Sequence, residues 1–107
     1  MAYDEDLDRR ITEAVEDWPA VRKKMFGGTC HLLNGNMVCG VLEDRLILRL
    51  GERAAGEALA QDSVQPFDIT GRPMKGWVMV EKIETEGAEL HQWLKRARAF
   101  VETLPPK

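Results

Sequence analysis

The sequence predicts an α+β fold, a two-layer sandwich in which helices pack on one face of an antiparallel meander sheet. Amphipathic stretches near both ends of the chain predict helices. In residues 24–50 the side chains alternate between apolar and polar, which predicts strands joined by tight turns. The strands share one strongly apolar face, so we expect the helices to pack there. The 107 residues show no internal repeat, low-complexity tract or linker, so we expect a single domain over residues 1–107.

Helical periodicity is clearest at the two ends of the chain. The first helix is expected at residues 4–17, with acidic side chains in its first turn and Pro19 ending it. Its apolar side chains recur every three or four residues: Leu7, Ile11, Ala14, Val15 and Trp18. A second long helix is expected at residues 90–104, and a shorter one, rich in Ala and Glu, at residues 52–61.

A hairpin is expected at Asn34-Gly35, because a type I′ turn needs positive φ at both central residues. A two-residue turn places Leu33 opposite Asn36 and Cys30 opposite Cys39. A second turn at residues 43–44 agrees with this register. Since side chains alternate across a sheet, the register predicts one apolar face, made by Cys30, Leu32, Met37, Cys39, Val41, Leu46, Leu48 and Leu50.

The second face of the predicted sheet carries polar side chains mixed with Leu33, Val38 and Ile47. A surface of this kind supports self-association, so we expect a homodimer. On the first face, Trp93 and Leu94 of the last helix are expected to pack on Val41, Leu46 and Leu48.

Charge and hydropathy limit the class of protein. Lys and Arg number 15 against 18 Asp and Glu, a net charge of -3, whereas a free-standing nucleic-acid binder is usually more basic. No apolar run approaches the ~18–20 residues that span a bilayer, and the acidic N-terminus does not read as a signal peptide. We therefore expect a small soluble cytoplasmic domain that does not act at a membrane.

Two basic clusters are candidate binding sites for phosphate or for an acidic partner. One is Arg22-Lys23-Lys24, and the other comprises Lys95, Arg96 and Arg98. Because the whole chain is acidic, we prefer the alternative that both clusters are solvated surface.

The segment 66–76, PFDITGRPMKG, reads as a loop next to a strand at residues 77–80. Arg72, Met74 and Lys75 could bind a small anion or a partner there. Equally, the segment could wrap the sheet edge and bury Phe67, Met74 and Trp77, and Phe67 with Ile69 could form a short strand.

Catalytic and metal-binding patterns are not found in the sequence. The predicted register makes Cys30 and Cys39 adjacent, and we expect them to be buried, reduced and poorly reactive. Two cysteines are too few for a complete zinc site, and His91 is expected in solvent beside the apolar stripe of its helix. We expect no cofactor, no metal and no catalytic residue.

Two segments resemble the TfoX N-terminal domain family: KKMFGGTCHLLNGNMVCGV at residues 23–41 and PFDITGRPMKGWVMV at residues 66–80. The opening MAYDEDL and the closing FVETLPPK are similar to it too. TfoX, also called Sxy, is a bacterial regulator of competence genes that works with the cyclic-AMP receptor protein. The resemblance implies an α+β fold similar to the YjbR and secretion-chaperone group. It covers only the first of two domains in those regulators, so we expect a stand-alone N-terminal domain.

The resemblance and the missing catalytic pattern together predict a non-enzymatic regulatory or protein-interaction module. Its protein partner is unknown, with the transcription machinery as one candidate. The alternative is a direct nucleic-acid-binding domain. A less favoured alternative is an S-adenosylmethionine-dependent RNA methyltransferase, a label that some family members carry although this sequence lacks the glycine loop such enzymes use.

Overall fold

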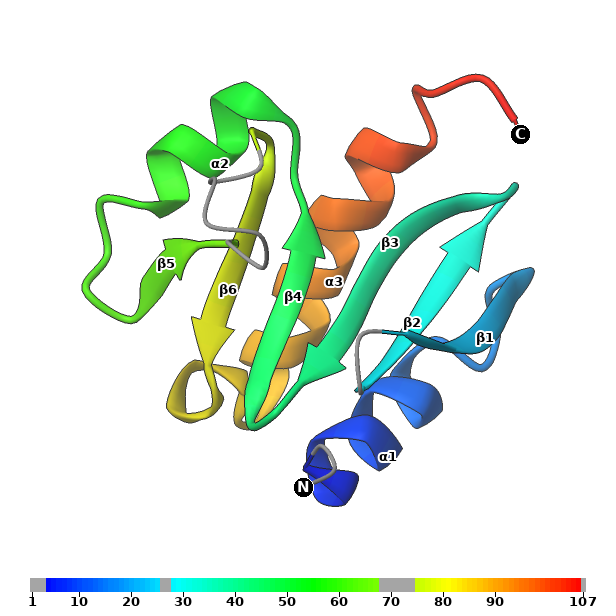
Figure 1. Ribbon diagram of the computed structural model, residues 1–107, viewed down its shortest axis with the longest axis horizontal. Helices are drawn as coiled ribbons and strands as arrows, with labels where there is room; N and C mark the ends of the chain where they lie inside the picture. Colours follow the sequence, from blue (N-terminus) through cyan, green and yellow to red (C-terminus); the bar gives the residue numbers. More distant parts are fainter. Residues whose placement is uncertain (1–3, 26–27, 68–74, 107) are drawn as a thin grey trace.

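Six antiparallel strands form one sheet, and three helices cover one of its faces (Figure 1). This computed structural model describes residues 4–25, 28–67 and 75–106. The predicted α+β fold with helices on one face is therefore confirmed. Among the described residues, no helix is both long and apolar enough to cross a membrane.

The strands lie in the sheet in the same order as in the sequence, except at one edge. Their order is β1-β2-β3-β4-β6-β5, so β6 lies between β4 and the short β5. Two strands differ from the prediction: β1 precedes the predicted meander, and the short strand before β6 lies N-terminal to Phe67. The bounds are β1 Ala20–Met25, β2 Gly28–Leu33, β3 Asn36–Leu42, β4 Arg45–Arg49, β5 Val64–Pro66 and β6 Trp77–Glu81.

The helices are α1 Glu5–Ala14, α2 Glu52–Ala58 and α3 Ala88–Val101, with a 3-10 turn η1 at Lys82–Thr85. Asp4 caps α1, because its carboxylate accepts a hydrogen bond from the Leu7 N–H at 3.0 Å. The same carboxylate accepts from Lys82 Nζ at 2.7 Å, which ties the start of α1 to η1. Gly51 precedes α2 with φ of 87°, and a Cβ there would lie 2.6 Å from the Phe100 ring.

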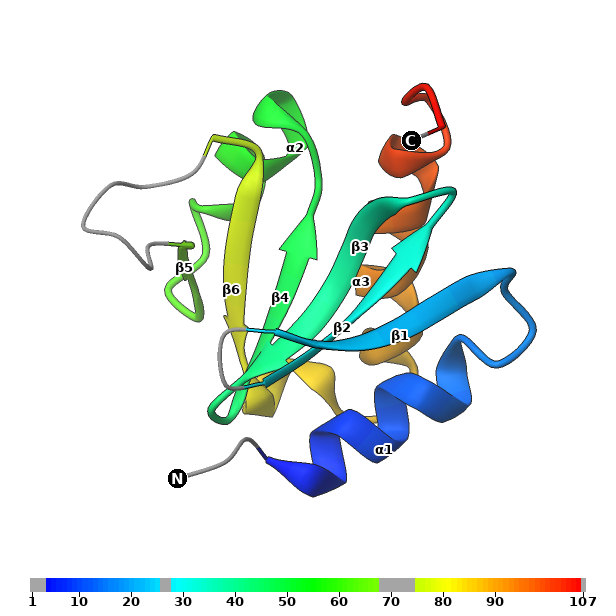
Figure 2. The same ribbon diagram turned by 45° about the vertical axis from the view of Figure 1, so that its right-hand side comes forward.

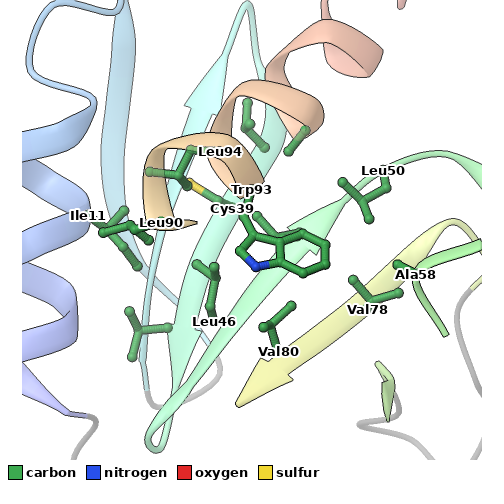
Figure 3. Packing of buried hydrophobic residues seen from close by; sticks show 14 of the residues in the cluster. Ile11, Cys39, Leu46, Leu50, Ala58, Val78, Val80, Leu90, Trp93 and Leu94 are labelled. Carbon is green, nitrogen blue, oxygen red and sulfur yellow. The ribbon is translucent and has the colours of Figure 1, made fainter. Parts of the chain in front are cut away.

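The core lies between the sheet and the three helices. Trp93 and Leu94 of α3 are 5% and 1% exposed and belong to one apolar cluster with Leu46, Leu48 and Val41, as predicted. Figure 3 shows the Trp93 ring among side chains from β4, the residue that follows it, β6 and α2: Leu46, Leu50, Ala58, Val78 and Val80.

The hairpin turn at Asn34-Gly35 is confirmed, because φ is 54° and 83° at its two residues and Leu33 lies opposite Asn36. The predicted pairing of Cys30 with Cys39 is wrong. A β-bulge follows the second pair, leaving Val38 without a partner, so His31 lies opposite Cys39 and Cys30 opposite Gly40. The turn has two residues as expected; the extra residue lies inside β3. Between β3 and β4 the predicted register holds.

The bulge exchanges the two faces of β2. His31 now shares a face with Cys39, which is in the core, whereas Cys30 shares the outer face with Gly40. Leu33 and Val38, which we expected on the outer face, are buried in the helix-covered core, so two of the three residues that suggested a homodimer are wrongly placed. Ile47 does lie on the outer face, but it is only 2% exposed.

Candidate functional site

A groove lies between α3 and the turn that follows α1. Its lining comes from two parts of the chain: Ala14 and Trp18 from the end of α1 and the turn after it, and His91, Leu94, Lys95 and Arg98 from α3. Its volume is about 630 Å³, within the range of small binding pockets. We call it the Trp18 groove.

The end of α1 positions the indole of Trp18. The helix ends at Ala14, and the Trp18 N–H donates to the Val15 carbonyl at 2.8 Å in a turn that Pro19 prevents from continuing as helix. Trp18 is thereby half-buried, packed against the edge of the core, while the chain turns into β1. The sequence predicted that this helix continues to residue 17, whereas α1 ends at Ala14. The half-exposed surface of Trp18 was not predicted.

Helix α3 supplies a row of polar side chains along the groove. His91, Lys95, Arg98 and Glu102 follow one another at steps of four, three and four residues, which places them on one side of the helix. The guanidinium carbon of Arg98 lies 4.9 Å from the centroid of the Trp18 ring, and Arg98 Nε donates to Glu102 at 3.2 Å. His91 is exposed, as predicted.

The groove therefore combines an apolar floor with a polar rim that carries two cations, Lys95 and Arg98, and one acid. Ala14, Leu94 and the indole of Trp18 form the floor, and Glu102 is the only acid among the described lining residues. Lys95 is exposed and makes no ion pair within the described ranges. Such a surface can bury apolar side chains and attract carboxylates.

The two predicted basic clusters take different places in the fold. Figure 2 shows β1 at the edge of the sheet, close to α1. Lys23 and Lys24 are exposed on this strand, while Arg22 Nη2 donates to Asp8 of α1 at 2.6 Å. The cluster on α3 is split. Lys95 and Arg98 line the Trp18 groove, but Arg96 lies 5.1 Å from the Trp93 ring centroid and faces a separate hollow next to α2.

The predicted anion-binding loop is described only at its ends. Lys75 is exposed and lines a hollow beside Trp77. Phe67 is buried, as the alternative interpretation expected, and its ring centroid lies 5.8 Å from that of Trp77, which is only half-buried. Arg72, Met74 and Ile69 lie outside the described residues, so anion binding there stays a prediction.

Both thiols are unpaired and buried, and burial raises the pKa of each. The bulge places Cys30 and Cys39 on opposite faces of the sheet, so the expected adjacent pair of thiols is wrong. Within the part of the chain that the structure describes, no three His, Cys, Asp or Glu side chains are arranged to hold a metal ion.

A polar cluster beneath α1 escaped the sequence analysis. Asp8, 8% exposed, accepts hydrogen bonds from Arg22 Nη2 and from Thr29 Oγ1, each at 2.6 Å. Burial raises the pKa of Asp8, because it disfavours the charged carboxylate. The two donors, Arg22 and Thr29, lower the pKa by more in total, so it lies below its usual value. The signal was present: Asp8 lies three residues before Ile11 and seven before Val15, in step with the apolar stripe.

His31 lies beside this cluster on the same face of β2. It is 3% exposed, and its Nε2 has no hydrogen-bond partner among the described residues. Burial lowers the pKa of His31, the nearby Asp8 carboxylate raises it, and Arg22 lowers it further. The net direction is downward, so the imidazole is held neutral at neutral pH.

The architecture is that of a small α+β domain whose helical layer carries an apolar groove with a polar rim that carries two cations. The chain belongs to the TfoX N-terminal domain family, whose model matches residues 13–101, from the last turn of α1 to the end of α3. No curated protein and no solved structure matches the chain. The resemblance identified in the sequence is thus confirmed at the level of the family.

Proposed function

We propose that this domain is a non-enzymatic protein-interaction module that regulates its partner by binding it at the Trp18 groove. The observation that supports this most is the half-buried indole of Trp18 beside Lys95, an exposed cation without an ion pair in the described residues. Aromatic anchors next to charged rims are typical of surfaces that bind proteins. The transcription machinery, in the cytoplasm, is the partner that family membership suggests.

Comparative capture from an extract of the native host tests this function. Wild-type domain, Trp18→Ala and Lys95→Glu are immobilised, with Lys24→Glu as a matched charge reversal on β1, away from the groove. Proteins enriched by the wild type and by Lys24→Glu should fall at least fivefold with Trp18→Ala and with Lys95→Glu. Quantitative mass spectrometry measures this, and equal capture by all four proteins would contradict the role of the groove.

Direct nucleic-acid binding is the second candidate, supported by the exposed Lys23 and Lys24 next to Arg22 on β1. Such binding should weaken steeply as salt rises, because each neutralised phosphate releases counterions. A fluorescent duplex that does not bind even at low salt would eliminate this candidate.

Calorimetric titration with S-adenosylmethionine tests the non-enzymatic part of the proposal, and a clear heat of binding would argue for a methyltransferase instead.

A further inference from the structure

We infer that the occupant of the Trp18 groove is an acidic amphipathic helix of the partner protein, an inference that rests on the proposed function. The long wall of the groove is helix α3, whose backbone N–H and C=O groups are bonded within the helix. A strand needs a free sheet edge to pair with, which this wall does not offer. A helix presents only side chains and can lie along such a wall.

The length of the groove fits a helix of a few turns. The lining side chains run from His91 to Glu102 on α3. The eleven steps of 1.5 Å between these two residues correspond to about 16 Å, or about three turns of a helix lying alongside.

The floor of the groove fits the apolar face of that helix. Trp18 and Ala14 are partly buried and pack against the core, and the buried Leu94 also lines the groove. Apolar side chains at positions i, i+3, i+4 and i+7 of a partner helix would cover Trp18 and Ala14. The burial of this surface would supply the main favourable free energy.

The rim determines the charge of the partner. Lys95 makes no ion pair within the described residues, and of the five N–H donors of Arg98 only Nε has a bonded partner among them, Glu102. Carboxylates flanking the apolar face of the partner would therefore meet two cations. Positive charge there would meet like charge, which selects against basic helices.

Single-stranded nucleic acid suits the groove less well than an acidic helix. Single strands bind through successive aromatic rings, and Trp18 is the one Phe, Tyr or Trp side chain in the described lining. A single strand also brings a phosphate with every nucleotide, whereas the described rim offers two cations, Lys95 and Arg98, beside Glu102.

A pair of synthetic peptides tests the inference. One, of about 14 residues, has leucine at i, i+3, i+4 and i+7 and glutamate on the flanking rows; the other has lysine in place of every glutamate. Fluorescence anisotropy should give at least tenfold tighter binding of the acidic peptide. Equal affinities, or tighter binding of the lysine peptide, would overturn the inference.

Charge reversal in the domain locates the binding. Lys95→Glu should weaken the acidic peptide about tenfold and strengthen the lysine peptide, whereas Lys24→Glu, an equal reversal on β1, should change either affinity less than twofold. Because Lys95 is exposed, the variant should fold, and the indole N–H of Trp18 should shift in an NMR titration with the acidic peptide. Binding that ignores Lys95 or leaves the Trp18 signal in place would place the peptide elsewhere and overturn the inference.

The outcomes separate this inference from the proposed function. If neither peptide binds while Trp18→Ala and Lys95→Glu still lose the captured host proteins, the groove binds a partner but the acidic helix is wrong. A single-stranded oligonucleotide that displaces the acidic peptide and binds more tightly would assign the groove to nucleic acid and also overturn the inference.

Discussion

At the scale of single residues, the most informative side chain is the buried His31. Its pKa in the folded protein lies below the ordinary value of 6.5, because burial disfavours the imidazolium. Below pH 6.5 the unfolded chain takes up a proton at this position before the folded protein does. The stability that neutral His31 contributes is thus fully present above pH 6.5 and is lost as the pH falls through the lower folded-state value.

We predict that the free energy of unfolding falls between pH 7 and pH 5, with a slope of at most about 1.4 kcal/mol per pH unit from this one proton. Urea denaturation at several pH values measures the slope. His31→Gln should flatten it relative to the wild-type protein. An NMR titration showing that His31 protonates above pH 6.5 in the folded protein would contradict the prediction.

Asp8 gives a second prediction at this scale. Asp8→Ala removes the acceptor of Thr29 Oγ1 and Arg22 Nη2, so it should cost about 1–3 kcal/mol of stability. Chemical denaturation at pH 7 measures the loss. Asp6→Ala is the control, because Asp6 is half-exposed and its pairs with Arg9 and Arg10 lie on the surface. An equal loss in the two variants would show that the buried hydrogen bonds of Asp8 add nothing.

At the scale of elements, α3 holds the two layers of the fold together. Trp93→Ala should cost about 3–5 kcal/mol, because it removes a nearly buried indole and leaves a cavity above β4 and β6. Thermal and urea unfolding measure the loss, with Arg96→Ala as the control for the cation that lies over the same ring. A loss below about 1 kcal/mol for Trp93→Ala would mean that the helix is held elsewhere.

An element could be predicted where its backbone geometry requires particular residue types or a particular apolar–polar pattern. The turn at Asn34-Gly35 was predictable because positive φ demands those residue types. The bulge was not, because Val38 and Cys39 are both apolar and carry no turn or glycine signal. Strand β1 was missed for most of its length because Val21 is followed by three basic residues, so apolar and polar side chains do not alternate. All four of these residues are exposed in the structure.

The groove was the least predictable part of the candidate site. Its lining comes from Ala14 and Trp18 near the N-terminus and from α3 near the C-terminus, and spacing along the chain carries no information about that approach. Lys95 and Arg98 were recognised as basic, but only the packing of α3 separates them from Arg96.

At the scale of the whole molecule, the burial of three apolar side chains bears on self-association. Leu33 and Val38 are buried in the core and Ile47 is 2% exposed, so none of the three offers the exposed apolar surface that we expected. The homodimer itself stays a prediction. Size-exclusion chromatography with light scattering at micromolar concentration tests it, and a monomer mass, which the burial of these side chains favours, would contradict it.

The unpaired residue in β3 also determines how this hairpin responds to a change in chain length. Deleting Val38 would remove one side chain from the core but leave every other partner across β2 and β3 unchanged. Deleting Gly40 would place Val41, or Cys39 if the bulge closes, opposite Cys30, where a Cβ would collide with the Thr29 carbonyl oxygen. We therefore predict that the protein lacking Val38 folds, with a loss typical of one truncated core side chain, and that the protein lacking Gly40 does not. Circular dichroism and urea unfolding of the two shortened proteins make the comparison, and the reverse order of stability would contradict it. A related chain that lacks the residue at position 38 can therefore keep the pairing of every other residue in β2 and β3.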